Sequence, residues 1–171
     1  MNKKGAAAAL ISFLIILVAF GASFACGEVL PATTEYYQIG ERVQTSTEML
    51  TVLSVERTNI YKRSGAGAIL RTKVYPPPTT LFIIVEVTVI NVGKDKYSIS
   101  PDDFTLTDLA GHEYAYTDYE GRDPYRGMGL DPGATTHGYI LYIVPEEITE
   151  FELSCTIHGT PPILAVWELE W

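Results

Sequence analysis

The chain has 171 residues, with 21 acidic and 12 basic side chains and a formal net charge of −9 at pH 7. Residues 1–25 contain two lysines and no acidic residue, so residues 26–171 carry a net charge of −11. An acidic chain of this length suits one domain and is a poor partner for nucleic acid or an anionic lipid surface, so we expect neither.

The N-terminus has the pattern of an export signal. Lys3 and Lys4 precede an uncharged, mostly apolar run, Gly5–Ala25, which ends in small residues. A positive start, an apolar middle and small residues at the end are typical of a signal peptide. We therefore predict that residues 1–25 are a signal peptide or membrane anchor. The rest of the chain is then extracytoplasmic, either anchored at the cell surface or secreted.

Three fates of this segment remain open. Cleavage after Ala25 releases a secreted domain, and cleavage with lipid attachment makes Cys26 the membrane anchor. The segment also suffices as an uncleaved anchor, since its 21 uncharged residues span about 31 Å as a helix. The lipidation signal departs from the usual pattern because Ser23 stands where an aliphatic residue is expected. In each case we expect membrane contact only through this N-terminal lipid or anchor.

The remaining chain reads as a tether over residues 26–36 and a folded domain over residues 37–171. Short runs of alternating apolar and polar residues are separated by turn residues, and none has the period of an amphipathic helix. The predicted strands are 42–45, 49–56, 81–91, 103–108, 112–116, 135–144, 151–157 and 165–171. Seven or eight such strands predict an all-β chain folded as an antiparallel β-sandwich.

The run Leu81–Asn91 is the strongest predicted strand, because it is nearly all apolar and β-branched. These residue types favour a central position in a sheet. We expect alternate residues to point to opposite faces. The buried face is predicted to hold Val85, Val87 and Val89, and the other face Glu86, Thr88 and Ile90.

The chain has two cysteines, Cys26 and Cys155. Cys155 alternates in phase with Phe151, Leu153 and Ile157, which predicts a small buried side chain on a strand. If Cys26 carries no lipid, the two cysteines are able to form a disulfide in an oxidising compartment.

Five basic residues lie in one stretch around the basic, proline-rich segment 62–80. They are Arg57, Lys62, Arg63, Arg71 and Lys73. The domain should therefore be electrically polar, with a basic loop on an acidic body. The segment is either a solvated insertion or a surface for an anionic polymer or acidic partner.

No pattern for catalysis stands out. No serine lies in a glycine-flanked nucleophile turn, and His112, His137 and His158 are isolated from one another. Residues 118–123 have oxygen ligands at alternating positions, but Arg122 among them argues against calcium. We expect no catalytic residue, cofactor or metal ion. The alternative is a metal-binding or hydrolytic envelope protein that uses loop carboxylates and histidines.

The long loop after residue 114 is the best candidate binding surface. Tyrosine and arginine suit recognition, because they offer large, stiff contact areas together with hydrogen bonds. The candidate residues are Tyr116, Tyr119, Arg122, Tyr125 and Arg126. The expected partner is a protein or an envelope polymer.

The order of motifs resembles the telokin-like, immunoglobulin-like domain family of unknown function, found in prokaryotic lipoproteins and secreted proteins. A relative of that family is the immunoprotective extracellular protein of mycobacteria. The matching residues are Ile39-Gly40-Glu41, Val89–Gly93, Asp103–Asp108 with Gly111 and Tyr114, Leu130–Gly133 and Gly138–Pro145. The resemblance implies an extracytoplasmic immunoglobulin-like β-sandwich without established catalytic residues. Together with the export signal, it favours a non-enzymatic binding or structural module.

Overall fold

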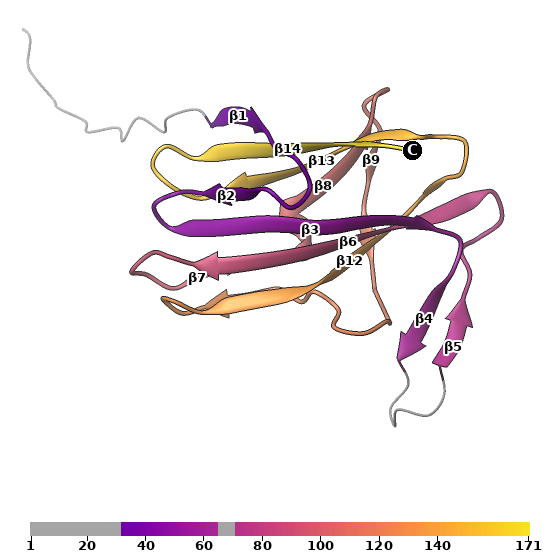
Figure 1. Ribbon diagram of the computed structural model, residues 1–171, viewed down its shortest axis with the longest axis horizontal. Helices are drawn as coiled ribbons and strands as arrows, with labels where there is room; N and C mark the ends of the chain where they lie inside the picture. Colours follow the sequence, from indigo (N-terminus) through magenta and orange to yellow (C-terminus); the bar gives the residue numbers. More distant parts are fainter. Residues whose placement is uncertain (1–31, 65–70) are drawn as a thin grey trace, which may run out of the picture.

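A computed structural model describes residues 32–64 and 71–171 (Figure 1). The predicted signal or anchor segment 1–25 and the lipidation candidate Cys26 lie outside these residues. None of the helices in the described ranges is long and apolar enough to cross a membrane.

Two five-stranded sheets face each other (Figure 1). The first sheet has the order β1 (Thr33–Tyr36), β14 (Ile163–Glu170), β13 (Glu150–Ile157), β8 (Phe104–Asp108) and β9 (Glu113–Tyr114). The second has the order β10 (Tyr116–Thr117), β12 (Thr135–Pro145), β6 (Thr80–Asn91), β3 (Glu48–Thr58) and β2 (Arg42–Gln44). All pairings except β1 with β14 are antiparallel. The predicted all-β sandwich is confirmed.

Two short strand pairs lie outside these sheets. β7 (Tyr97–Ile99) pairs with β11 (Met128–Leu130), and β4 (Tyr61–Ser64) pairs with β5 (Arg71–Val74). A single 3-10 turn over Pro101–Asp103 is the only helical element in the described ranges.

Strand β6 is the centre of the second sheet, as its composition predicts. It pairs along most of its length with β3 on one side and β12 on the other. Val85, Val87 and Val89 are fully buried against the first sheet. Glu86, Thr88 and Ile90 point the other way and are half-buried. The predicted faces of this strand are therefore confirmed.

The main core lies between the two sheets. Its largest fully buried side chains are Trp167, Tyr142 and Phe151, contributed by both sheets. Cys155 on β13 is a buried free thiol within this core, in phase with Phe151 as predicted. Burial raises the pKa of the Cys155 thiol well above its usual value, which keeps the thiol neutral.

The folded domain begins earlier than the predicted boundary at residue 37. Residues Thr33–Tyr36, assigned to the tether, form β1 and pair in parallel with β14. β1 joins the first sheet because the edge of β14 has unpaired backbone N–H and C=O groups, and the backbone of β1 forms hydrogen bonds with them. Alternation is hard to recognise in so short and exposed a strand.

The basic, proline-rich segment is an ordered hairpin where the structure describes it. β4 and β5 extend away from the sandwich (Figure 1). At the base of the hairpin, Tyr61 and Val74 pack on a second apolar cluster with Phe82, Ile84 and Leu141. This cluster lies on the outer face of β6 and β12, so the base of the hairpin helps to cover that part of the second sheet.

The outer face of the first sheet is acidic. The register of β13 and β14 places Glu150 opposite Glu170 and Glu152 opposite Glu168. These four side chains point away from the main core, because the residues between them are buried. The basic hairpin is attached to the other sheet, so the predicted separation of charge is present in the fold.

A buried carboxyl group, Glu48, joins the two sheets at one end of the sandwich. Its Oε2 accepts a hydrogen bond of 3.1 Å from the backbone N–H of His158. Thr45 and Thr47 donate to the His158 carbonyl oxygen at 2.5 and 2.6 Å. Glu48 is fully buried, and its Oε1 has no partner among the described residues. Burial raises the pKa of Glu48 from 4.5 to about 7.

This buried carboxyl should make stability fall as the pH rises. A raised pKa in the folded state adds stability below the ordinary value of 4.5, and that stability is lost as the pH passes about 7. The expected loss from this group is about 3 kcal/mol. Urea unfolding of the full chain across this range should show the decline in wild type, and Glu48→Gln should remove it. An equal decline in the variant would contradict this role of Glu48.

Candidate functional site

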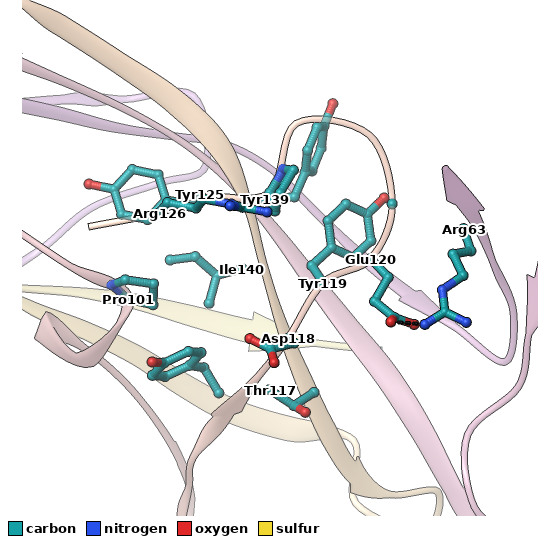
Figure 2. Close-up of a pocket in the computed structure, with 13 residues that line it drawn as sticks. Arg63, Pro101, Thr117, Asp118, Tyr119, Glu120, Tyr125, Arg126, Tyr139 and Ile140 are labelled. Atoms are coloured by element: carbon teal, nitrogen blue, oxygen red, sulfur yellow. Dashed lines mark hydrogen bonds and ion pairs between the residues drawn. The ribbon is translucent and has the colours of Figure 1, made fainter. Parts of the chain in front are cut away.

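A hollow of about 680 Å³ lies on the surface beside β10 and β12. We call it the tyrosine hollow and define it by Pro101, Tyr116, Asp118, Tyr119, Arg126 and Tyr139. Figure 2 shows Pro101 at one end and the Arg63–Glu120 pair at the other, with Ile140 and Asp118 between them.

The loop that forms most of the hollow is held against β12 by backbone contacts. The N–H of Tyr125 donates to the Tyr139 carbonyl at 2.9 Å, and the N–H of Tyr139 donates to the Asp123 carbonyl at 3.0 Å. A Cβ at Gly138 would lie 2.6 Å from the Tyr125 backbone. Glycine at position 138 therefore allows the loop to approach β12 this closely.

A row of aromatic rings fixes the position of Tyr119. Its ring centroid lies 5.1 Å from that of Tyr61 on the hairpin and 5.6 Å from that of Tyr139 on β12. The row continues from Tyr61 to Phe82 at 5.1 Å and from Tyr139 to His137 at 5.7 Å. Burial raises the pKa of the Tyr119 phenol, so its hydroxyl stays protonated at neutral pH.

The charges in the hollow are mixed. Arg63 on the hairpin forms an ion pair with Glu120 on the loop. Asp118 and Arg126 form no side-chain hydrogen bond or ion pair with any other residue that the structure describes. One acidic and one basic group thus remain available to a ligand.

Four of the five predicted binding residues lie at the tyrosine hollow, although Tyr125 is buried there, and the fifth lies outside it. Tyr116, Tyr119 and Arg126 line the tyrosine hollow. Tyr125 also borders it, but only 4% of this residue is exposed and its ring packs edge-on against Phe104 in the main core. The prediction that Tyr125 is a surface residue is wrong, because the backbone contacts of its loop turn the ring inward.

Arg122 lies outside the tyrosine hollow. It pairs with Asp123 at 2.9 Å and borders a second hollow of about 440 Å³ together with Tyr61 and Lys62. Tyr119 separates the two hollows and borders both. Arg122 and Arg126 therefore border different but neighbouring hollows, and a common binding surface for both residues stays a prediction.

Sequence reasoning missed Asp118 and Tyr139 as members of the site. In the sequence, Asp118 stands out only as one of the alternating oxygen ligands of residues 118–123. The alternation along β12 places Tyr139 on the face opposite the buried Ile140, and this signal was available in the sequence. Its position beside the loop depends on a tertiary contact, and the sequence contains no local signal for that contact.

For the hydrolytic alternative, the described residues offer one polar cluster around Glu86, in which the histidine does not contact the serine. Glu86 accepts hydrogen bonds from Ser54 at 2.7 Å and Tyr139 at 3.0 Å, and lies 3.0 Å from His137 Nε2. The Ser54 hydroxyl, followed by the His137 contact, lowers the pKa of Glu86. Since the carboxylate stands between serine and histidine, the imidazole is not placed to take the serine proton.

The backbone N–H groups of the other two histidines, His112 and His158, donate hydrogen bonds to carboxyl groups, those of Asp108 and Glu48. His112 donates its backbone N–H to Asp108 and places Nδ1 3.0 Å from the same carboxylate. These contacts, led by the backbone hydrogen bond, lower the pKa of Asp108 to about 2. Within residues 32–64 and 71–171, no three His, Cys, Asp or Glu side chains converge as metal ligands.

The protein is thus a β-sandwich with a hollow on its surface, which is formed largely by one loop. The model of a family described as a domain of unknown function, DUF4352, matches residues 37–163, and the chain belongs to this family. The family resemblance predicted from the order of motifs is confirmed. A comparison with curated protein sequences finds no match.

Solved structures with a similar fold come from several bacteria. A β-sandwich protein of Clostridium difficile has 14% identity and a TM-score of 0.57, over 82% of this chain and 97% of that one. The candidate lipoprotein YcdA of Bacillus subtilis has 18% identity and a TM-score of 0.56, over 75% of this chain and only 38% of YcdA. The secreted protein MPT63 of Mycobacterium tuberculosis has 17% identity and a TM-score of 0.47, over 81% of this chain and 99% of MPT63.

Aromatic contacts, more than the ion pair, should hold the hairpin to the loop. Tyr119→Ala removes two ring contacts from a partly buried position, whereas Arg63→Ala removes an exposed ion pair worth at most about 1 kcal/mol. Amide hydrogen exchange of β4 and β5 should therefore speed up much more in Tyr119→Ala than in Arg63→Ala. The reverse order would show that the ion pair is the main attachment.

Proposed function

We propose that this chain is a non-enzymatic, extracytoplasmic binding module that uses the tyrosine hollow to hold a protein or an envelope polymer. The observation that carries the proposal is the hollow itself. Three tyrosine rings and two unpaired charges of opposite sign line a concave surface of the size that small-molecule sites have. Tyrosine and arginine are the residue types that contribute most to binding energy in recognition surfaces.

The aromatic row supports this function, because it prepares the site before a ligand arrives. Tyr119 and Tyr139 are held by neighbouring rings and by the backbone contacts of the loop. Side chains that are already fixed lose little conformational freedom on binding, which lowers the entropic cost of association. A loop that contacts only solvent does not require this packing of aromatic rings.

The location outside the cytoplasmic membrane is part of the proposal. The export pattern of residues 1–25 favours it, and the fold is shared with a candidate lipoprotein. We infer that membrane contact is limited to the N-terminal segment or a lipid on Cys26. The acidic outer face of the first sheet supports this, since it repels anionic lipid head groups.

Binding can be tested with the full-length protein and an envelope fraction from the cells that produce it. The protein is kept in a detergent without a sugar head group, and its retention on the sedimented fraction is measured. The double variant Tyr116→Ala/Arg126→Ala should lose retention by at least about tenfold, which corresponds to 1.4 kcal/mol.

The matched control is Tyr75→Ala/Lys94→Ala, which changes the same kinds of exposed side chain outside the hollow. The control should bind like wild type, and both variants should unfold at the wild-type temperature. Wild-type protein that is not retained, or a Tyr116/Arg126 variant that is retained equally, would refute the binding site.

A further inference from the structure

We propose that the tyrosine hollow binds a neutral carbohydrate chain, an inference that rests on the proposed binding function. The shared features of the lining residues point to this ligand class. They offer flat apolar faces, hydrogen-bond groups of both kinds and almost no net charge.

The tyrosine rings provide the faces on which sugar rings stack. Tyr116 is 36% exposed, and Tyr119 and Tyr139 are partly exposed. The face of an aromatic ring carries partial negative charge, so it attracts the polarised C–H bonds on the apolar side of a pyranose ring. Because the aromatic row holds Tyr119 and Tyr139 in place, these surfaces exist before a sugar binds.

The polar groups suit hydroxyl groups, which both donate and accept hydrogen bonds. The Asp118 carboxylate only accepts, the Arg126 guanidinium only donates, and the tyrosine hydroxyls do both. Asp118 lies at the middle of the hollow, between Pro101 at one end and Glu120 at the other (Figure 2). A ligand over this position meets an acceptor and a stacking surface together.

The balance of charge favours neither polyanions nor cations. Arg63 and Glu120 neutralise each other, and Asp118 and Arg126 supply one charge of each sign. Because the charges in the hollow sum to zero, neither a polyanion nor a basic peptide gains an overall electrostatic attraction there. A neutral ligand with many hydroxyl groups does not depend on such an attraction, since it binds through hydrogen bonds and ring contacts.

The dimensions favour a chain of sugars over a folded protein. The hollow of about 680 Å³ lies within the range of about 300–1,000 Å³ typical of small-molecule sites. A stable protein interface covers about 800 Å² on each partner and has an apolar centre. Here charged side chains border the hollow on several sides.

The experiment extends the sedimentation assay with two treatments of the envelope fraction. Protease removes accessible proteins, and periodate cleaves the carbon–carbon bonds between neighbouring hydroxyl groups of sugars. Retention of the full-length protein should survive protease and raised salt concentration but fall at least about tenfold after periodate. Loss after both treatments also supports the proposal, since it indicates a glycan carried on a protein.

Other outcomes overturn the carbohydrate and leave the binding function standing. Retention that is lost after protease but not after periodate identifies a protein partner. Retention that is lost in raised salt identifies a charged polymer. Retention that changes with neither protease nor periodate identifies a different ligand. Two results would refute both the carbohydrate ligand and the proposed binding function. They are a wild-type protein that is not retained at all, and a Tyr116→Ala/Arg126→Ala variant that is retained as well as wild type.

Single substitutions separate stacking from general structural effects. Tyr116→Phe keeps the ring and should retain most of the binding, whereas Tyr116→Ala should lose it. Asp118→Asn removes the charged acceptor and should weaken binding several-fold, while Asp95→Asn at an exposed position outside the hollow should not. Equal behaviour of Tyr116→Phe and Tyr116→Ala would overturn the stacking role.

Discussion

The first half of β6 is apolar on both faces, and the rest of the structure is arranged to cover both. Ile83 and Val85 face the main core, while Phe82 and Ile84 point to the opposite side and are also buried. A strand hydrogen-bonded on both edges can be shielded from water only by layers above and below it. The first sheet supplies one layer, and the hairpin together with the loop carrying Tyr119 supplies the other.

The site follows from where this extra layer ends. Tyr61 and Tyr119 cover Phe82 and Ile84, but the next two outward residues of β6, Glu86 and Thr88, are polar and need no such cover. The margin of the layer therefore leaves aromatic rings half exposed beside a polar sheet surface. The tyrosine hollow at this margin needs no separate scaffold, because two of the side chains that line it, Tyr119 and Tyr139, also take part in packing.

The sequence allowed the strands and their buried faces to be predicted wherever alternation or strong β-branched character extended over many residues. β6 is the best example, and Cys155 was placed correctly by its phase with Phe151. Local pattern gave no signal for contacts between distant segments. The pairing of Thr33–Tyr36 with β14, the inward turn of Tyr125 and the separation of Arg122 from Arg126 all depend on such contacts. For the same reason, neither interpretation of the segment 62–80, as a solvated insertion or as a surface for an anionic partner, anticipates that Tyr61 and Val74 are packed at the base of its hairpin.

The glutamates opposite one another on β13 and β14, and the lysines of the hairpin on the other side of the sandwich, give the domain a permanent electric dipole. Near a negatively charged surface, the electric field exerts a torque on this dipole, which turns the hairpin toward the surface and the glutamate face away from it. The effect reaches only about 8 Å at physiological salt, so it acts only on a molecule that is already close to the surface. A domain within that distance is oriented, with the hairpin and its neighbouring hollows on the side facing the charged surface.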